Sequence, residues 1–137
     1  MWSVCKTLLI GLGKEDEFSL DRFKKAVAKG FRSLEAEDAD IITFCLPPAL
    51  VYLDVENAVE ATAEAACLTN YEFVKYKSNW ESKKFSEFQI MYDRDKDVTA
   101  SMRAGEIIGQ ATNLARDLVN EPANFMTPLQ LADEAVQ

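Results

Sequence analysis

The sequence contains no histidine among its 137 residues. Histidine is the usual proton shuttle near neutral pH and the usual partner of a nucleophilic serine or cysteine. Its absence therefore excludes Ser-His and Cys-His nucleophile pairs, and it also excludes zinc sites ligated by histidine. Most hydrolase mechanisms cannot be assembled from the residues of this chain alone.

Cysteine is scarce as well. The three cysteines, Cys5, Cys45 and Cys67, are far apart in the sequence, and each has apolar neighbours. An odd number of widely spaced cysteines favours neither a disulfide framework nor a metal site. We expect all three to be buried, reduced thiols.

Two further absences bear on location and partners. The sequence has no run approaching the roughly 18 apolar residues that a membrane-spanning helix needs, and its N-terminus lacks the features of a signal peptide. The formal net charge of −8 argues against nucleic-acid binding, because phosphate contacts need clustered Lys and Arg. We expect a cytoplasmic protein with neither membrane nor nucleic acid as a partner.

The composition is that of a globular chain. Hydrophobic residues make up 48% and charged residues 28% of the sequence, and the length suits one domain with its own core. The pattern of apolar residues along the chain then indicates the type of fold.

A glycine-containing segment, Gly11-Leu12-Gly13-Lys14, follows the first apolar run. A dinucleotide fingerprint would need a third glycine where Asp16 stands. A P-loop would need four residues between its first glycine and the Gly-Lys pair, and then Ser or Thr, whereas Glu15 follows here. We interpret the segment as a turn.

Strand and helix patterns alternate along the chain. Apolar and β-branched runs predict strands near residues 4–10, 41–46 and 88–92. Apolar residues spaced three and four apart predict helices near residues 19–34, 54–67 and 98–120. The alternation predicts an α/β fold, with a layered mixed sheet, flanking helices and a long final helix. Short strands within 51–55 and 71–77 would complete the sheet.

Three local patterns give further expectations. The run at 41–46 stops at Pro47, which is typical of a central strand buried on both faces. Ser19 is a plausible N-cap, and the basic residues after it are interpreted as a solvated helix face, with an anion site as the alternative. Aromatic and basic residues interleave in 68–78; we expect a cluster that closes the core, with base stacking as the alternative that the net charge disfavours.

The segment after the long helix joins it to another helix. Pro122 disfavours helical backbone at Glu121, so the long helix is expected to end just before it. Thr127 is a good N-cap, Pro128 suits the first helical position, and Gln130 occupies the capping-box position. The sequence therefore predicts one helix ending, a tight connector and another helix beginning.

This junction resembles a signature of the leucyl aminopeptidases. Residues 114–124 read Leu-Ala-Arg-Asp-Leu-Val-Asn-Glu-Pro-Ala-Asn, followed by Met-Thr-Pro at 126–128 and Leu-Ala at 131–132. A second pattern of that family is matched by Leu68, Tyr71, Phe73, Tyr76 and Lys77. Ala66-Cys67 replaces the acidic-glycine pair that is usual before this pattern, which is typical of a divergent member.

The resemblance implies the N-terminal, non-catalytic domain of a cytosolic two-metal exopeptidase. Such an enzyme removes N-terminal amino acids, Leu preferentially, from peptides, and it assembles as a homo-hexamer. The implied organisation is a macro-domain-like α/β domain at 1–97, a long linker helix and Asn-Glu-Pro-Ala-Asn turn at 98–124, and the truncated start of the catalytic domain at 125–137. Two divalent cations, Zn or Mn, would belong to the full-length parent.

The resemblance places no catalytic and no metal-binding residue in this chain, and it implies that the chain binds no cofactor. The family motif is interpreted as a structural junction, with these residues: Arg116, Asp117, Asn120, Glu121, Pro122, Ala123 and Asn124. An alternative stays open, a stand-alone macro-like module that binds a nucleotide or ADP-ribose-like ligand, or that serves interactions. Fold likeness alone argues for that module, and it is a weak guide to function.

Overall fold

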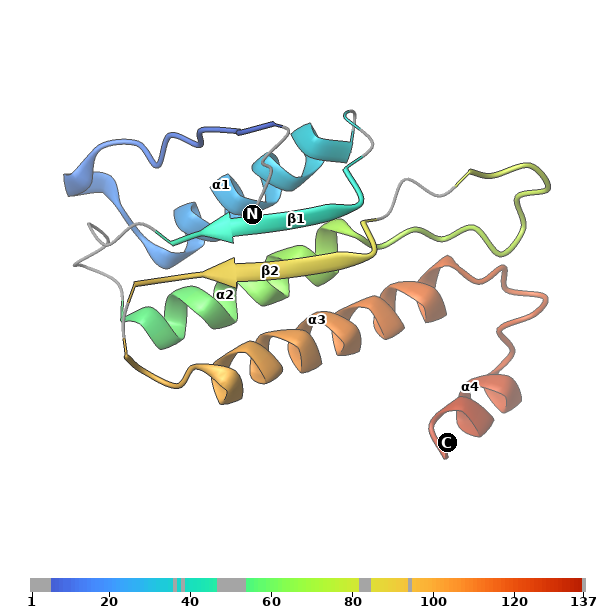
Figure 1. The fold of residues 1–137 in the computed structure, drawn as a ribbon. Coiled ribbons are helices and arrows are strands. Elements are labelled where there is room, and N and C mark those ends of the chain that lie inside the picture. Colours follow the sequence, from blue (N-terminus) through green and yellow to red (C-terminus); the bar gives the residue numbers. More distant parts are fainter. Residues whose placement is uncertain are drawn as a thin grey trace.

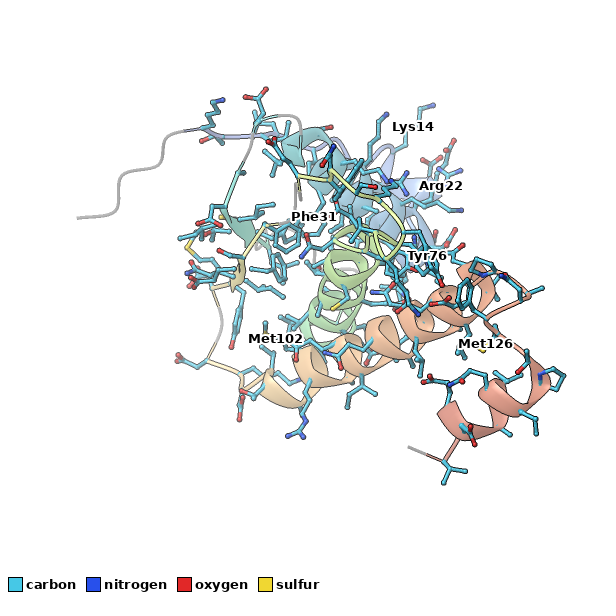
Figure 2. All side chains as sticks on the ribbon, turned by 90° about the vertical axis from the view of Figure 1, so that its right-hand side faces the viewer. Lys14, Arg22, Phe31, Tyr76, Met102 and Met126 are labelled. Atoms are coloured by element: carbon cyan, nitrogen blue, oxygen red, sulfur yellow. The ribbon has the colours of Figure 1, made fainter. Side chains whose placement is uncertain are left out.

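The computed structural model describes residues 6–35, 37, 39–46, 54–81, 85–93 and 95–136. A two-stranded parallel sheet forms one layer. Helices α1 (Leu20–Glu35) and α2 (Val55–Thr69) cover one face of that sheet, and α3 (Thr99–Asn120) lies along α2 (Figures 1 and 2). This arrangement confirms the predicted α/β class.

The sheet consists of β1 (Ile41–Cys45) and β2 (Glu87–Met91). The two strands run parallel, with Ile41 opposite Glu87 and Cys45 opposite Met91. Parallel neighbours need a crossover connection, and α2 supplies the helix of that connection. Alternate residues point to the helices, so one face of each strand joins the core.

Helix α1 covers this sheet with one apolar stripe, as its sequence predicts. Phe23, Val27 and Phe31 are each no more than 2% exposed. The Phe31 ring meets the Phe88 ring of β2 edge to face at 5.2 Å between centroids. The predicted N-cap is confirmed, since the Ser19 hydroxyl accepts a hydrogen bond from the backbone N–H of Arg22 at 3.3 Å.

Helix α2 is the centre of the helical layer and contacts both α1 and α3. Small side chains allow this close packing, and the glutamates are confined to one stripe, Glu56, Glu60 and Glu64. Its buried residues are Val55, Ala58, Val59, Ala61, Thr62, Ala63, Ala65 and Ala66. The one buried hydroxyl is satisfied within the helix, because Thr62 donates to the carbonyl of Ala58 at 2.6 Å.

Helix α3 runs along α2 for 22 residues, about 33 Å at 1.5 Å per residue. Gly105 and Gly109 form the contact. A Cβ at Gly105 would lie 2.2 Å from the Glu60 carbonyl oxygen, and one at Gly109 would lie 2.5 Å from the Cys67 Cβ. Glycine is therefore required at both positions by the closeness of the two helices.

The predicted strand at 4–10 is wrong over the described residues 6–10, which form neither helix nor strand. Ile10 packs on α1 instead. A Cβ built at Gly30 would lie 2.3 Å from Ile10 Cδ1 and 3.8 Å from a methyl of Leu8. Residues 6–10 are not part of the described sheet, which pairs two strands from later in the chain.

The strand predicted within 71–77 is also wrong, because these residues form a loop with a turn at 75–76. The strand predicted within 51–55 lies mostly outside the described residues, and Val55 begins α2. In the described part of the chain, the sheet is therefore narrower than the sequence predicts.

The burial of β1 corrects two further expectations. The strand is covered on one face only, since Ile42 is 6% exposed but its neighbour Ile41 is 56% exposed. In the described part of the chain, α1 and α2 cover one side of the sheet (Figure 2), and Ile41 and Met91 on the other side are exposed. Cys45 is consequently exposed rather than buried, while Cys67 is partly buried; both are free thiols. Cys5 lies outside the described residues.

After α3 the chain turns and enters α4 (Pro128–Glu134). The Thr127 hydroxyl accepts from the backbone N–H of Gln130, as the capping pattern predicts. Every described residue from 127 to 136 is exposed. Helix α4 therefore projects from the helical layer beside the C-terminal end of α3 (Figure 1).

Candidate functional site

The two stretches that carry the family resemblance meet in the structure. The loop that follows α2 lies against the C-terminal part of α3, although the contacting residues are separated by 45 to 49 positions in the sequence. Figure 2 shows Tyr76 of this loop beside the end of α3, with Met126 beyond it toward α4. We call this contact region the junction.

Tyr71 is the centre of the junction. Its hydroxyl donates to Asp117 Oδ1 at 2.6 Å and accepts from Asn120 Nδ2 at 3.1 Å. The Arg116 guanidinium lies over the Tyr71 ring, 3.8 Å from its centroid. Partial burial, together with the hydrogen bond to Asp117, raises the pKa of the Tyr71 hydroxyl, so it remains a donor at neutral pH.

The same face of α3 caps the end of α2. Arg116 Nη1 donates to the Leu68 carbonyl at 3.1 Å, and Asn113 Nδ2 donates to the Cys67 carbonyl at 3.0 Å. The last carbonyls of a helix have no partner within it, and a cation near them also opposes the negative end of the helix dipole. Arg116 and Asn113 therefore fix where α2 ends relative to α3.

Glu121, the first residue after α3, links that helix to the loop. Its side chain is only 8% exposed and forms an ion pair with Lys75. Its second oxygen accepts a hydrogen bond from the Tyr76 hydroxyl. The donors lower the pKa of Glu121, Lys75 first and Tyr76 second, and Glu121 in turn raises the pKa of both partners.

The connector after Glu121 is a compact turn. The Pro122 carbonyl accepts from the N–H of Phe125 at 2.8 Å and from the N–H of Met126 at 3.0 Å. The Phe125 ring packs on the Tyr76 ring at 5.7 Å between centroids. The turn is therefore held by its own backbone and by the loop, and it sets the direction in which the chain enters α4.

An open groove of about 690 Å³ lies between this loop, α3 and α4. Its apolar lining includes Phe73, Val74, Leu114, Leu118, Phe125 and Met126. Its charged lining consists of Glu72, Asp117, Glu121 and Glu134 together with the cation Lys75. The groove is thus apolar with a net negative charge.

The motif residues separate into three kinds by position. Arg116, Asp117, Asn120 and Glu121 contact the loop through side chains. Pro122 contributes its carbonyl to the turn. Ala123 and Asn124 lie in the exposed turn itself.

Sequence reasoning missed the partners of these residues. Tyr71, Phe73 and Tyr76 were expected to close the core, but they pack toward the junction, and Tyr76 is 48% exposed. Asn113 and Lys75 were not singled out. One feature of the sequence pointed to this contact. The stretches 68–77 and 114–128 both resemble patterns of the same family, and such patterns can belong to one contact region.

The described side chains of the junction join the end of α2 and its loop to the end of α3. Among the described residues, no three Asp, Glu, Cys or His side chains are grouped so that they could hold a metal ion. None of the helices in the described part of the chain is both long and apolar enough to cross a membrane.

Comparison with known proteins identifies the family. The family model described as "Cytosol aminopeptidase family, N-terminal domain" matches residues 3–79. The chain is similar to probable cytosol aminopeptidases of Aquifex aeolicus, with 34% identity over 97% of this chain, and of Bacillus subtilis, with 35% identity over 92%. It spans about a quarter of the length of these curated relatives, 26% in both cases.

A solved structure is similar over most of the fold. The bottromycin maturation enzyme BotP in complex with Mn superimposes with a TM-score of 0.74 and 28% identity. The match covers 91% of this chain and 25% of that one. The family model, the relatives and the fold agree. The chain therefore belongs to the cytosol aminopeptidase family and corresponds to the N-terminal domain of that family's proteins.

Proposed function

We propose that this chain is the non-catalytic N-terminal domain of a longer leucyl aminopeptidase. The proposed organisation is the macro-like α/β domain at 1–97, the linker helix and turn at 98–124, and the start of the catalytic domain at 125–137. The observation that carries the proposal is the match to the N-terminal family model, combined with relatives about four times as long as the matched region.

The proposed role of the junction motif is structural. Arg116, Asp117, Asn120 and Glu121 bind the end of α2 and its loop to the end of α3. The turn begun by Pro122 then aims the chain away from the helical layer. The motif thereby fixes how the N-terminal domain is presented to the part of the polypeptide that follows.

The chemistry is proposed for the parent polypeptide. Two divalent cations, Zn or Mn, would be held downstream, where they would activate a bridging water for attack on the first peptide bond of a substrate. The Mn named with BotP supports a metal-dependent family chemistry. A homo-hexamer, peptide substrates with N-terminal Leu and a cytoplasmic location complete the proposal, with no membrane and no nucleic-acid partner.

The gene provides the direct test. We expect the reading frame to continue past codon 137 for several hundred codons and to encode a cluster of acidic metal ligands. The encoded polypeptide should hydrolyse leucine p-nitroanilide when Mn or Zn is supplied, and lose that activity with a chelator. A stop codon immediately after Gln137, or a metal-loaded full polypeptide without activity, would sink the proposal.

The alternative hypothesis, a stand-alone binding module, predicts a different result in ligand binding. A macro-like module should bind ADP-ribose, whereas a scaffolding domain should not. Calorimetry with ADP-ribose, and a gel shift with duplex DNA at low salt, distinguish the two classes. Micromolar binding in either experiment would favour the module.

A further inference from the structure

Helix α3 is apolar on two opposite faces. One face carries Gly105 and Gly109 and is buried on α2. The opposite face carries uncharged apolar residues at spacings of 4, 3, 4, 3 and 4: Ala100, Ala104, Ile107, Ala111, Leu114 and Leu118. This is the spacing of a helix that packs against a second partner along its whole length. We call this row the outer seam.

The outer seam is open in the structure. Ile107 is 55% exposed and Leu114 is 56% exposed. The outward face of a surface helix is normally charged or polar, and a contiguous apolar row there marks an interaction site. Ile107 and Leu114 of the seam, and Phe125 of the groove, are all large apolar side chains that are exposed.

The outer seam continues into the groove at the junction. Leu114 and Leu118 belong to both, and the groove adds Phe73, Val74 and Met126. The groove also contacts α4 through Gln130 and Glu134. The apolar surface therefore extends along α3 to the point where the chain leaves the domain.

We propose that the outer seam of α3 and the groove together form the docking surface for the rest of the domain that follows this one in the longer family polypeptides. The first residues of that domain already line one side of the groove through Phe125, Met126, Gln130 and Glu134. This inference rests on the proposed function. Relatives are about four times as long as the matched N-terminal part, so a large partner on the same chain is at hand. The surface also broadens at the end from which that partner would emerge.

The residues of the docking surface indicate which side chains the partner should present to it. Alanines at three of the six seam positions leave shallow spaces that large aliphatic or aromatic side chains would fill. Four carboxylates against one lysine in the groove lining call for Lys or Arg opposite the α4 end. The docking face is therefore apolar along the seam and basic beside the groove.

A second copy of the chain is a weaker occupant. Two copies paired only along α3, a contact about 33 Å long, would cover the seam and leave the groove open, whereas stable interfaces bury about 800 Å² on each partner. A domain that covers both the seam and the groove would bury more surface than such a helix pair does. Sedimentation of the 137-residue chain should therefore show a monomer at micromolar concentration.

The test compares thiol labelling with and without a following domain. Leu114→Cys is placed in the 137-residue chain and in a chimera in which residues 1–137 replace the matching N-terminal part of the Bacillus subtilis relative. Labelling with a maleimide, read at that peptide by mass spectrometry, should be at least about tenfold slower in the chimera. The control Val119→Cys is an aliphatic position on the same helix, 84% exposed and off the seam, and should label equally in both.

A pair of polar substitutions gives an independent measurement. Ile107→Gln with Leu114→Gln should shift the melting temperature of the 137-residue chain by no more than about 3 °C, because both side chains are already exposed. In the chimera the same pair should lower the melting temperature by more than about 5 °C and speed proteolysis at the turn after α3. The control Val119→Gln should change neither protein.

The outcomes are decisive in both directions. Equal labelling of Leu114→Cys in a folded chimera, or a seam-dependent dimer of the short chain, overturns the proposal. So does failure to fold of this chimera and of its counterpart made with the Aquifex aeolicus relative, since the surface would then not accept a family partner. These readouts need no aminopeptidase activity, so they are separate from the gene and activity tests of the proposed function.

Discussion

At the scale of single residues, the junction depends on side chains whose donors and acceptors match. Tyr71 donates to Asp117 while accepting from Asn120, and Glu121 receives both Lys75 and Tyr76. A carboxylate that is only 8% exposed needs such donors, because an unpaired one would be costly to bury. This explains why the segment needs acid, amide and arginine side chains at these positions.

The paired carboxylate predicts a pH dependence. Donors lower the pKa of Glu121, so its contribution to stability is present above the unfolded pKa of about 4.3 and is lost as the pH falls through the lower folded pKa. Urea unfolding should show Glu121→Gln to be less stable than the natural chain at pH 7, with the difference shrinking as the pH falls below about 4.3. A difference that stays constant from pH 7 to pH 3 would contradict this role.

At the scale of elements, α2 and α3 approach closely because glycine stands where a Cβ would overlap. A Cβ at Gly105 would lie 2.2 Å from the Glu60 carbonyl oxygen and 2.9 Å from the Ala63 Cβ. Neither neighbour is the end of a flexible side chain, so one helix must move. The length of α3 follows from its own sequence, but its place depends on this contact.

Gly105→Ala should therefore destabilise the fold. Alanine favours helix by about 1 kcal/mol over glycine, and overpacking of a tight core contact costs about 1–3 kcal/mol, more where backbone is hit, so we expect a net loss of about 1–2 kcal/mol. The control is Gly11→Ala, where a Cβ meets nothing within 4 Å and the backbone is not left-handed. That change should be neutral or slightly stabilising in thermal unfolding. Equal effects at the two positions would exclude the tight contact as the cause.

Helix α4 should be only weakly protected from hydrogen exchange. A seven-residue helix is marginal on its own in water, and the described residues around it are exposed. The amides of Leu131 to Val136 should exchange with solvent far faster than those of β1. Protection equal to that of β1 in a proven monomer would mean that α4 belongs to this domain's core, and the proposed boundary after Asn124 would then be wrong.

At the scale of the whole molecule, both the sheet and helix α3 have one buried face and one exposed face. The sheet is open on the face away from the helices, and α3 is open on the face away from α2 (Figure 2). Such surfaces suit a domain that works as part of a larger assembly. The proposed place within an aminopeptidase gives the α3 surface a partner.

The 137-residue chain alone is predicted to be inactive as an aminopeptidase. Two-metal hydrolysis needs clustered ligands with an open coordination position, and the described residues hold no group of three or more potential ligands. Purified chain with added Mn or Zn should therefore not hydrolyse leucine p-nitroanilide. Hydrolysis that persists through successive purification steps, in proportion to the amount of the 137-residue chain, would contradict this prediction.

Local patterns in the sequence by themselves determined most of the helical elements. The apolar spacing of α1, α2 and α3, the proline after α3 and the Thr127 cap are properties of neighbouring residues, and the structure has these features where they were expected. The family resemblance likewise came from short contiguous stretches, and the family model confirms it. Interactions within a few residues act in the same way wherever the segment lies in the fold.

Only the tertiary structure decided the pairing of distant segments. Apolar composition is the same for a strand covered on one face or two, so the sequence could not show that Ile41 is exposed while Ile42 is buried. It could not show that Ile10 packs on α1, or that Tyr71 meets Asp117 across 46 positions. Which apolar surfaces meet depends on the whole set of packed elements, because the hydrophobic effect has no direction of its own.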